Sequence, residues 1–154
     1  MRLLKLGLVG TLLLWTYLFS STNPAKSTGE LDFTFDTASF RSSRGDVYQE
    51  FYYQLLLDQL SFNQVDDLLI DSVLVEFELI KDNETTYTDS EMKPIVSSLF
   101  QPVSGILLPD QFDLLFEPGD YTAILTLTEQ STGKHGTSTL SFSAPKFPKN
   151  QFSA

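Results

Sequence analysis

The chain has no cysteine, and it has a single histidine and a single tryptophan among its 154 residues. The missing cysteines exclude a disulfide scaffold, a thiolate zinc site, a cysteine nucleophile and lipid attachment through an N-terminal cysteine. Basic residues are also scarce, because 10 Lys and Arg stand against 20 Asp and Glu and give a formal net charge of -10. The phosphate backbone of nucleic acid would repel such a chain, so we expect no nucleic-acid partner.

The N-terminus has the three-part layout of a secretory signal. Arg2 and Lys5 precede a mostly apolar, uncharged run over residues 6–19, and small and polar residues follow over 20–25. This pattern predicts export, with residues 1–21 as a signal peptide or an uncleaved anchor. A helix over 6–19 would span only ~21 Å, less than the ~30 Å hydrocarbon core of a bilayer. We therefore expect an extracytoplasmic protein of the bacterial periplasm or cell envelope, secreted or N-terminally anchored.

Large apolar side chains are plentiful, with 42% hydrophobic and 13% aromatic residues. This content predicts a packed core rather than disorder, and the length suits one domain. We expect a polar linker over 22–30, a β-sandwich domain over 31–147, and a C-terminal tail or start of a further linker over 148–154. Removal of the signal would take away Arg2 and Lys5, leaving 8 basic against 20 acidic residues and a net charge of -12.

Beyond residue 30 the apolar residues recur with a period of two, which is the period of a strand with one buried face. The pattern covers residues 31–36, 47–57, 68–81, 112–116, 121–129 and 137–144. About seven strands separated by turn signals predict an all-β fold, an antiparallel sandwich of the immunoglobulin or fibronectin kind. A small closed barrel is the alternative.

Some segments depart from this simple alternation. The apolar positions slip by one residue to Ala38 and Phe40, which predicts a bulge or bend. The polar residues 85–88 follow a hairpin turn and predict a strand at the edge of a sheet. Residues 92–108 are poorly periodic and rich in Pro and Gly, so we expect a loop with one short strand there. Residues 54–60 leave a short helix open as an alternative.

Tyr121 follows the turn Pro118-Gly119-Asp120 and opens a late strand. Sandwiches of the immunoglobulin kind place a corner tyrosine at this position, and its hydroxyl bonds to nearby backbone. The alternative is an ordinary strand residue. We therefore name Tyr121 as a candidate corner tyrosine.

The order of several apolar motifs resembles the N-terminal sandwich region of bacterial GWxTD-domain-containing proteins, which are exported and of largely unassigned function. The motifs are Leu31-Asp32-Phe33, Phe40, Tyr52-Tyr53, Leu60-Ser61-Phe62, Pro118-Gly119-Asp120-Tyr121 and Phe142-x-Ala-Pro-x-Phe147. The Gly-Trp-x-Thr-Asp signature itself is absent, because the only tryptophan is Trp15. The resemblance thus implies a front portion without the signature domain, and it transfers no functional residues.

Residues with catalytic chemistry are few. His135 lies in the predicted hairpin loop 130–136 beside Lys134, where an exposed imidazole has neither a partner nor a sheltered site. The chain also has no Gly-x-Ser-x-Gly elbow. We therefore expect no enzyme activity and no cofactor.

Carboxylates form three groups in predicted loops, and they give an alternative function. These groups are Asp66-Asp67-x-x-x-Asp71, Asp82-x-Glu84 and Asp89-x-Glu91, whose oxygens could coordinate Ca²⁺. The spacing of an EF-hand loop is absent, and solvated acidic loops are the alternative. Asn83 heads a formal glycosylation sequon at a predicted hairpin tip, which has meaning only in a eukaryotic secretory pathway.

Tyr48, Tyr52 and Tyr87 are candidates for an exposed aromatic surface that binds a partner protein or a sugar. Together these observations predict a non-catalytic, exported β-sandwich that serves as an interaction or spacer domain. A calcium- or carbohydrate-binding module is the alternative. The expected partner is a protein or a missing downstream domain, and the expected membrane contact is through the N-terminal segment alone, if that segment stays uncleaved.

Overall fold

The regular structure of the described residues is almost entirely β-strand. The structure is a computed structural model that describes residues 24–41 and 46–147, so the predicted signal 1–21 and the tail 148–154 lie outside it. Its elements are β1 (Ala25–Lys26), β2 (Thr28–Gly29), β3 (Phe33–Arg41), β4 (Val47–Leu56), the 3₁₀ turn η1 (Leu57–Gln59), β5 (Asn63–Val65), β6 (Leu68–Lys81), β7 (Glu84–Ser98), β8 (Leu107–Phe116), β9 (Gly119–Glu129) and β10 (His135–Ala144). Within the described ranges, no helix is long and apolar enough to cross a membrane.

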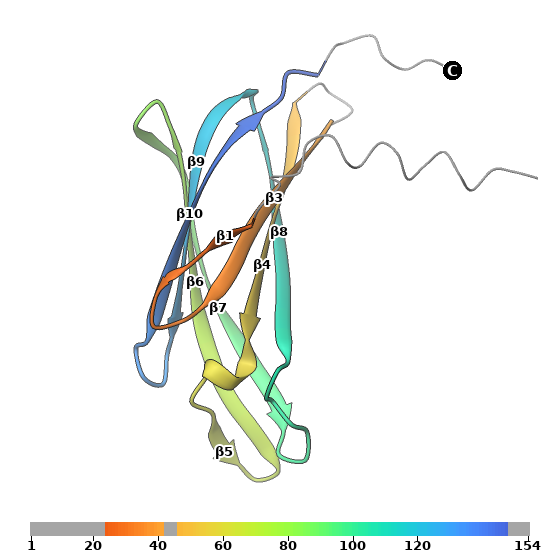
Figure 1. Cartoon of the computed structure of the whole chain (residues 1–154), viewed down its shortest axis with the longest axis vertical. Coiled ribbons are helices and arrows are strands. Elements are labelled where there is room, and N and C mark those ends of the chain that lie inside the picture. The colour runs from red at the N-terminus through yellow and green to blue at the C-terminus, as the bar shows by residue number, and fades with distance from the viewer. Residues whose placement is uncertain (1–23, 42–45, 148–154) are drawn as a thin grey trace, which may run out of the picture.

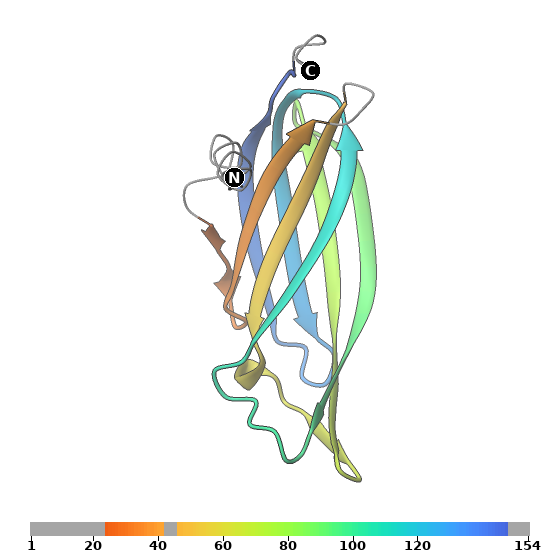
Figure 2. The ribbon, with the colours of Figure 1, turned by 90° about the vertical axis from the view of Figure 1, so that its right-hand side faces the viewer.

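The strands form two antiparallel sheets that face each other (Figure 1). One sheet has the order β1-β3-β4-β8. The other has the order β2-β10-β9-β6-β5, with β7 also paired to β6. Figure 2 shows the first sheet in front of the second. The predicted all-β antiparallel sandwich is therefore confirmed, and the closed barrel is wrong because the two sheets share no strand in the described part of the chain.

The core is made by the inward-facing residues of both sheets, which alternate along each strand as the period of two requires. Phe33 and Phe35 of β3 are buried, as are Phe51 of β4 and Phe77 of β6. The ring of Phe51 lies 4.9 Å from that of Phe77 and 5.2 Å from that of Phe112 on β8. Aromatic rings from both sheets thus meet in one cluster and hold the sheets together.

The slip of the apolar pattern at Ala38 does not produce a bulge, because β3 pairs with β4 in one continuous register. Instead, a polar residue occupies the next inward position. Thr37 is buried, and its hydroxyl donates to the Glu50 carbonyl at 2.7 Å and accepts from Gln49 Nε2 at 2.5 Å. A satisfied polar group can replace an apolar one in the interior, so the strand continues and Phe40 faces outward.

Residues 92–108 contain more strand than the sequence indicated. β7 continues through Pro94 to Ser98, so the predicted loop is wrong over residues 92–98. Proline is tolerated here because β7 pairs only with β6, and a residue of an edge strand can direct its missing N–H away from the ladder. The predicted edge position of residues 85–88 agrees with this pairing.

The segment predicted as a polar linker, 22–30, contains β1 and β2. Ala25 lies opposite Phe35 on one sheet, and Gly29 lies opposite Gly136 on the other. The serine hydroxyl of Ser27, between the two strands, donates to the Leu31 carbonyl at 2.9 Å. Residues 25–29 therefore belong to the sandwich and contact both of its layers.

Candidate functional site

The outer face of the four-stranded sheet carries a row of apolar side chains across three strands. Tyr48 of β4 lies opposite Phe40 of β3 on one side and Leu115 of β8 on the other. The rings of Phe40 and Tyr48 are 6.3 Å apart, and Phe40 and Leu115 are 39% and 63% exposed. We call these three residues the Tyr48 row. A continuous apolar patch over adjacent strands is typical of a contact surface.

Carboxylates lie next to the Tyr48 row. Glu50 lies opposite Asp113 in the adjacent row, and it accepts a hydrogen bond from the Tyr52 hydroxyl. Desolvation, with the charges of Asp113 and Glu50, raises the pKa of Tyr48. Burial and the bond to Glu50 raise the pKa of Tyr52 as well. Both hydroxyls therefore stay protonated, and the carboxylates beside them form an acidic rim on this face.

Tyr87 lies on a different surface from Tyr48 and Tyr52. It sits on the edge strand β7 opposite the buried Leu79, and its ring is 6.2 Å from that of Phe77. A groove of about 450 Å³ runs past it between β7 and β8. The structure thus brings two of the three candidate tyrosines together and places the third at the open edge between the sheets.

A polar clamp closes part of this open edge, and sequence reasoning did not find it. Lys93 Nζ of β7 lies 2.9 Å from Asp110 Oδ2 of β8 and 3.1 Å from Glu91 Oε2. The Tyr53 hydroxyl donates to the same Asp110 oxygen at 2.7 Å. Burial alone would raise the pKa of Asp110, but the hydrogen bonds from Lys93 and Tyr53 outweigh it and lower this pKa. The clamp joins the two sheets where they share no ladder.

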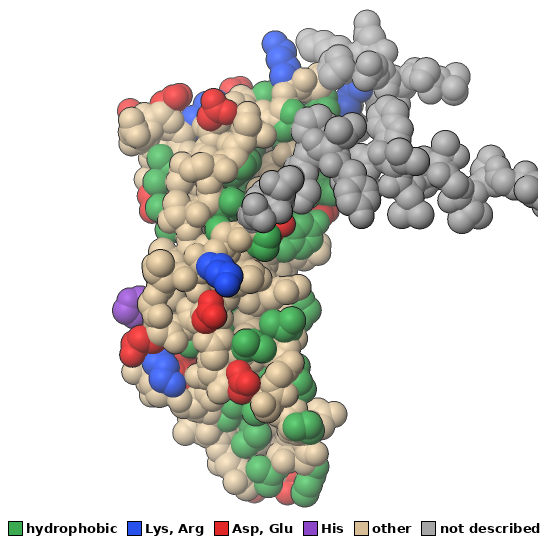
Figure 3. Space-filling view, viewed as in Figure 1, with side chains coloured by type: hydrophobic (Ala, Val, Ile, Leu, Met, Phe, Trp, Pro, Cys, Tyr) green, Lys and Arg blue, Asp and Glu red, His purple; other side chains and the backbone are tan. Residues whose placement is uncertain are grey.

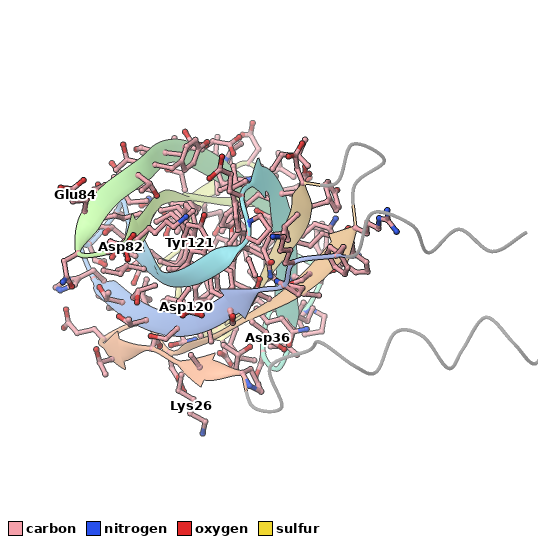
Figure 4. The ribbon with its side chains drawn as sticks, turned by 90° about the horizontal axis from the view of Figure 1, so that it is seen from above. Lys26, Asp36, Asp82, Glu84, Asp120 and Tyr121 are labelled. Atoms are coloured by element: carbon pink, nitrogen blue, oxygen red, sulfur yellow. The ribbon has the colours of Figure 1, made fainter. Side chains whose placement is uncertain are left out.

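The acidic residues considered as calcium ligands do not converge. Asp66 and Asp67 are exposed in the β5–β6 turn, whereas Asp71 is buried. Asp82 and Glu84, labelled in Figure 4, belong to the β6–β7 hairpin, which lies at the opposite end of the sandwich from the β5–β6 turn (Figure 1). Among the described residues, no group of three or more His, Cys, Asp or Glu could hold a metal ion.

Asp71 instead belongs to a buried network around Glu129, the last residue of β9. Glu129 is fully buried, and its carboxylate accepts hydrogen bonds from the Ser61 N–H and the Thr132 hydroxyl. Lys134 Nζ lies 3.8 Å from Glu129 Oε2. The network connects the segment after η1 to the β9–β10 turn. It therefore stabilises the end of the sandwich that lies at the bottom of Figure 1, which we call the lower end.

The two carboxyl groups of this network have pKa values shifted in opposite directions. Burial and a hydrogen bond with Glu129 raise the pKa of Asp71. Burial also disfavours charge on Glu129, but the bonds from Thr132 and the Ser61 N–H outweigh it and lower the pKa of Glu129. A carboxyl whose folded-state pKa is raised loses its stabilising contribution as the pH rises through that value. Ionised Asp71 therefore destabilises the fold at neutral pH.

We expect Asp71→Asn to raise the free energy of unfolding at pH 7 by about 1 kcal/mol, because the amide keeps a donor toward Glu129 without a charge. The gain should disappear below the ordinary pKa of 3.8, where Asp71 is protonated in both folded and unfolded states. Urea unfolding followed by circular dichroism between pH 3 and pH 7 would measure this, with the exposed Asp67→Asn as control. A gain that does not change with pH would contradict the raised pKa.

His135 and Asn83 lie at the surface. His135 is the exposed first residue of β10, and its side chain is visible at the surface in Figure 3. Its backbone carbonyl accepts hydrogen bonds from the N–H groups of Glu30 and Leu31 at 2.8 and 3.2 Å. Asn83 occupies the tip of the β6–β7 hairpin with a φ of 65°. The positions of both residues therefore follow from the turns in which or beside which they lie.

No protein-family model matches the chain, and no curated protein matches its sequence. One of the similar solved structures is chicken MD-1 complexed with lipid IVa, which is 12% identical. The alignment covers 78% of this chain and 97% of that chain, with a TM-score of 0.31. A similarity of this size supports no conclusion about the function of this chain.

Proposed function

We propose that the chain is a non-catalytic, exported β-sandwich that binds another protein, or spaces two parts of an envelope assembly, through the Tyr48 row. The observation that carries this proposal is the apolar row on three adjacent strands beside an acidic rim. The outer face of β9 and β10 differs, because its Thr and Ser side chains pair with one another. Thr122 Oγ1 lies 3.3 Å from Ser141 Oγ, and Thr126 Oγ1 lies 3.0 Å from Thr137 Oγ1. A solvated polar face needs no partner, whereas the apolar row does.

The strand order supports a fibronectin-like variant of the immunoglobulin sandwich. Seven of the described strands have nine residues or more: β3, β4, β6, β7, β8, β9 and β10. In an immunoglobulin constant domain the first, second, fifth and fourth strands share a sheet, and the third, sixth and seventh form the other. Here the fourth long strand, β7, pairs with the third, β6. We therefore propose that this strand has changed sheets.

Tyr121 supports the same proposal. It lies near the start of β9, and its side chain points between the sheets (Figure 4). Its hydroxyl donates to the Glu117 carbonyl, four residues upstream, at 2.8 Å. This bond is the one that a corner tyrosine makes.

We expect Tyr121→Phe to lower the free energy of unfolding by about 1 kcal/mol, because the substitution removes the bond to Glu117 and keeps the ring. Urea unfolding would measure the loss. Tyr87→Phe is the control, since the side chain of Tyr87 is exposed at a sheet edge, and we expect it to change stability by less than about 0.5 kcal/mol. Equal losses in both variants would contradict a corner role for Tyr121.

Site-specific photocrosslinking in the native host would test the proposed function. A benzoylphenylalanine at position 48 should give one discrete larger product, which mass spectrometry identifies. The same residue at position 139, which is exposed on the other sheet, should not. For the purified partner, Leu115→Ser should raise the Kd at least tenfold, as truncation at the centre of a contact does.

Identical products from positions 48 and 139 would show non-specific contact and contradict the proposal. If position 48 gives no product, protein binding through the Tyr48 row is contradicted, and only the spacer function of the proposal remains. The calcium and carbohydrate alternatives predict instead a melting temperature that rises with Ca²⁺ or with sugar. The resemblance to the front portion of GWxTD-domain-containing proteins stays a prediction.

A further inference from the structure

Seven large apolar side chains gather at the end of the sandwich opposite the one where β10 finishes (Figures 1 and 3). They come from the β5–β6 hairpin, the end of β7, the β7–β8 loop and the start of β8, and they are 40–78% exposed. We call them the apolar tip: Val65, Leu68, Val96, Leu99, Phe100, Ile106 and Leu107. They are seven of the eleven exposed large hydrophobic residues in the described ranges. Such a concentration marks an interaction site.

Backbone hydrogen bonds hold the apolar tip in place. The Leu99 N–H donates to the Asp67 carbonyl at 2.9 Å, which joins the β7–β8 loop to the β5–β6 turn. The Leu57 N–H donates to the Ile106 carbonyl at 2.9 Å, which joins the other end of the loop to η1. A surface held in this way needs little ordering when it binds.

The segments that build the apolar tip, 57–71 and 95–110, contain five Asp and no Lys, Arg or His. Asp71 is buried and Asp110 is paired with Lys93, and Lys134 reaches Gln59 and Ser61 at the edge of this region. Asp58, Asp66 and Asp67 are exposed there. A second copy would bring like charges together, and an anionic membrane surface would repel the tip. The complementary surface is a protein with an apolar centre and a basic rim.

We infer that the apolar tip binds a partner protein that presents an apolar pocket surrounded by Lys and Arg. Phe100 is 78% exposed and is the natural anchor for such a pocket. The inference goes beyond binding at the Tyr48 row. Leu115 and Leu107 mark the two surfaces on the same strand, eight residues and roughly 26 Å apart at ~3.3 Å per residue. The domain therefore links two proteins, one at each end.

Photocrosslinking from position 100 in the native host, with the full chain, tests this inference. The product should contain a protein different from the one captured at position 48. With that protein purified, calorimetry should show a Kd at least tenfold higher for Phe100→Ser and for Asp66→Lys/Asp67→Lys. Leu115→Ser is the matched control at the other end and should leave this Kd unchanged. Phe100→Ser should melt at the wild-type temperature, because the side chain is exposed.

Several results would overturn the inference. One is a product that contains only two copies of this chain. Another is sedimentation with phosphatidylglycerol vesicles that Phe100→Ser abolishes, since the occupant would then be lipid. Unchanged binding by Asp66→Lys/Asp67→Lys would contradict the basic rim. A product at position 48 with none at position 100 would contradict binding at the apolar tip and leave the proposal for the Tyr48 row standing. A product at position 100 with none at position 48 would contradict binding at the Tyr48 row alone.

Discussion

Phe51→Ala should lower the free energy of unfolding by about 3–5 kcal/mol, the range for truncating a buried phenylalanine. Phe51 is fully buried on β4, and its ring lies within 6.0 Å of four others, those of Phe35, Phe77, Phe112 and Phe142. These rings come from both sheets, so the neighbours cannot close the cavity without moving the sheets. A domain of this size has only about 5–15 kcal/mol of stability, so the variant would lose a large part of it.

Urea unfolding followed by far-ultraviolet circular dichroism would measure this loss. Phe100→Ala is the matched control, because it removes the same side chain from the exposed apolar tip and should change stability by about 0.5 kcal/mol or less. A loss below about 1.5 kcal/mol for Phe51→Ala would mean that the sheets do not pack through this ring. If the variant is too unstable for a full urea transition, its lower melting temperature gives a second measurement of the loss.

The sheets could be predicted where one face of a strand is buried and the other is solvated. Along β6, the inward residues Val73, Val75, Phe77 and Leu79 alternate with outward ones, and the strand has the bounds 68–81 that the alternation indicated. Alternation is a local property of strand geometry, so a single sequence contains it. The outward positions of Tyr48 and Tyr52 could be predicted for the same reason, since both fall on the outward parity of β4. The placing of Phe40 and Leu115 beside Tyr48 depends on strand pairing and could not.

The edge strand β7 could not be predicted in full, because 11 of its 15 residues are exposed and only Ile95 is buried. A strand with so few buried residues has little alternation to detect, and Pro94 argued for a loop. The apolar tip was missed for a related reason. Val96 and Phe100 were assigned to the unperiodic stretch 92–108, and their nearness to Leu68 follows from the β6–β7 register.

The buried network at the lower end required pairing information that sequence cannot supply. Asp71 and Glu129 are 58 positions apart, and they meet because Val73 lies opposite Glu129 between β6 and β9. Sequence reasoning placed Asp71 with Asp66 and Asp67, its neighbours along the chain. Asp66 and Asp67 instead form the exposed β5–β6 turn, whereas Asp71 is buried on β6.

Gly136→Ala should lower the free energy of unfolding by about 3 kcal/mol, although glycine in a strand is ordinarily less stabilising than alanine. A Cβ at position 136 would lie 2.1 Å from the backbone oxygen of Leu31. Overpacking of this kind costs roughly 1–3 kcal/mol. Relief of the clash would move the segment that carries Leu31, whose fully buried side chain contributes roughly 1.5–3 kcal/mol. A loss of stability in Gly136→Ala therefore indicates that the segment carrying Leu31 lies against β10, whereas a gain indicates that it does not.

The measurement is urea unfolding together with amide hydrogen exchange of residues 28–31. Exchange at Glu30 and Leu31 should accelerate in Gly136→Ala, because both N–H groups donate to the His135 carbonyl in the wild type. Gly133→Ala is the control: its Cβ would meet nothing within 4 Å, and its positive φ of 77° alone should cost about 1–2 kcal/mol. A Gly136→Ala variant as stable as the wild type, with unchanged exchange, would contradict the docking of β2. In that case residues 22–30 would be the free linker that their polar composition indicates, and the sandwich would begin at residue 31.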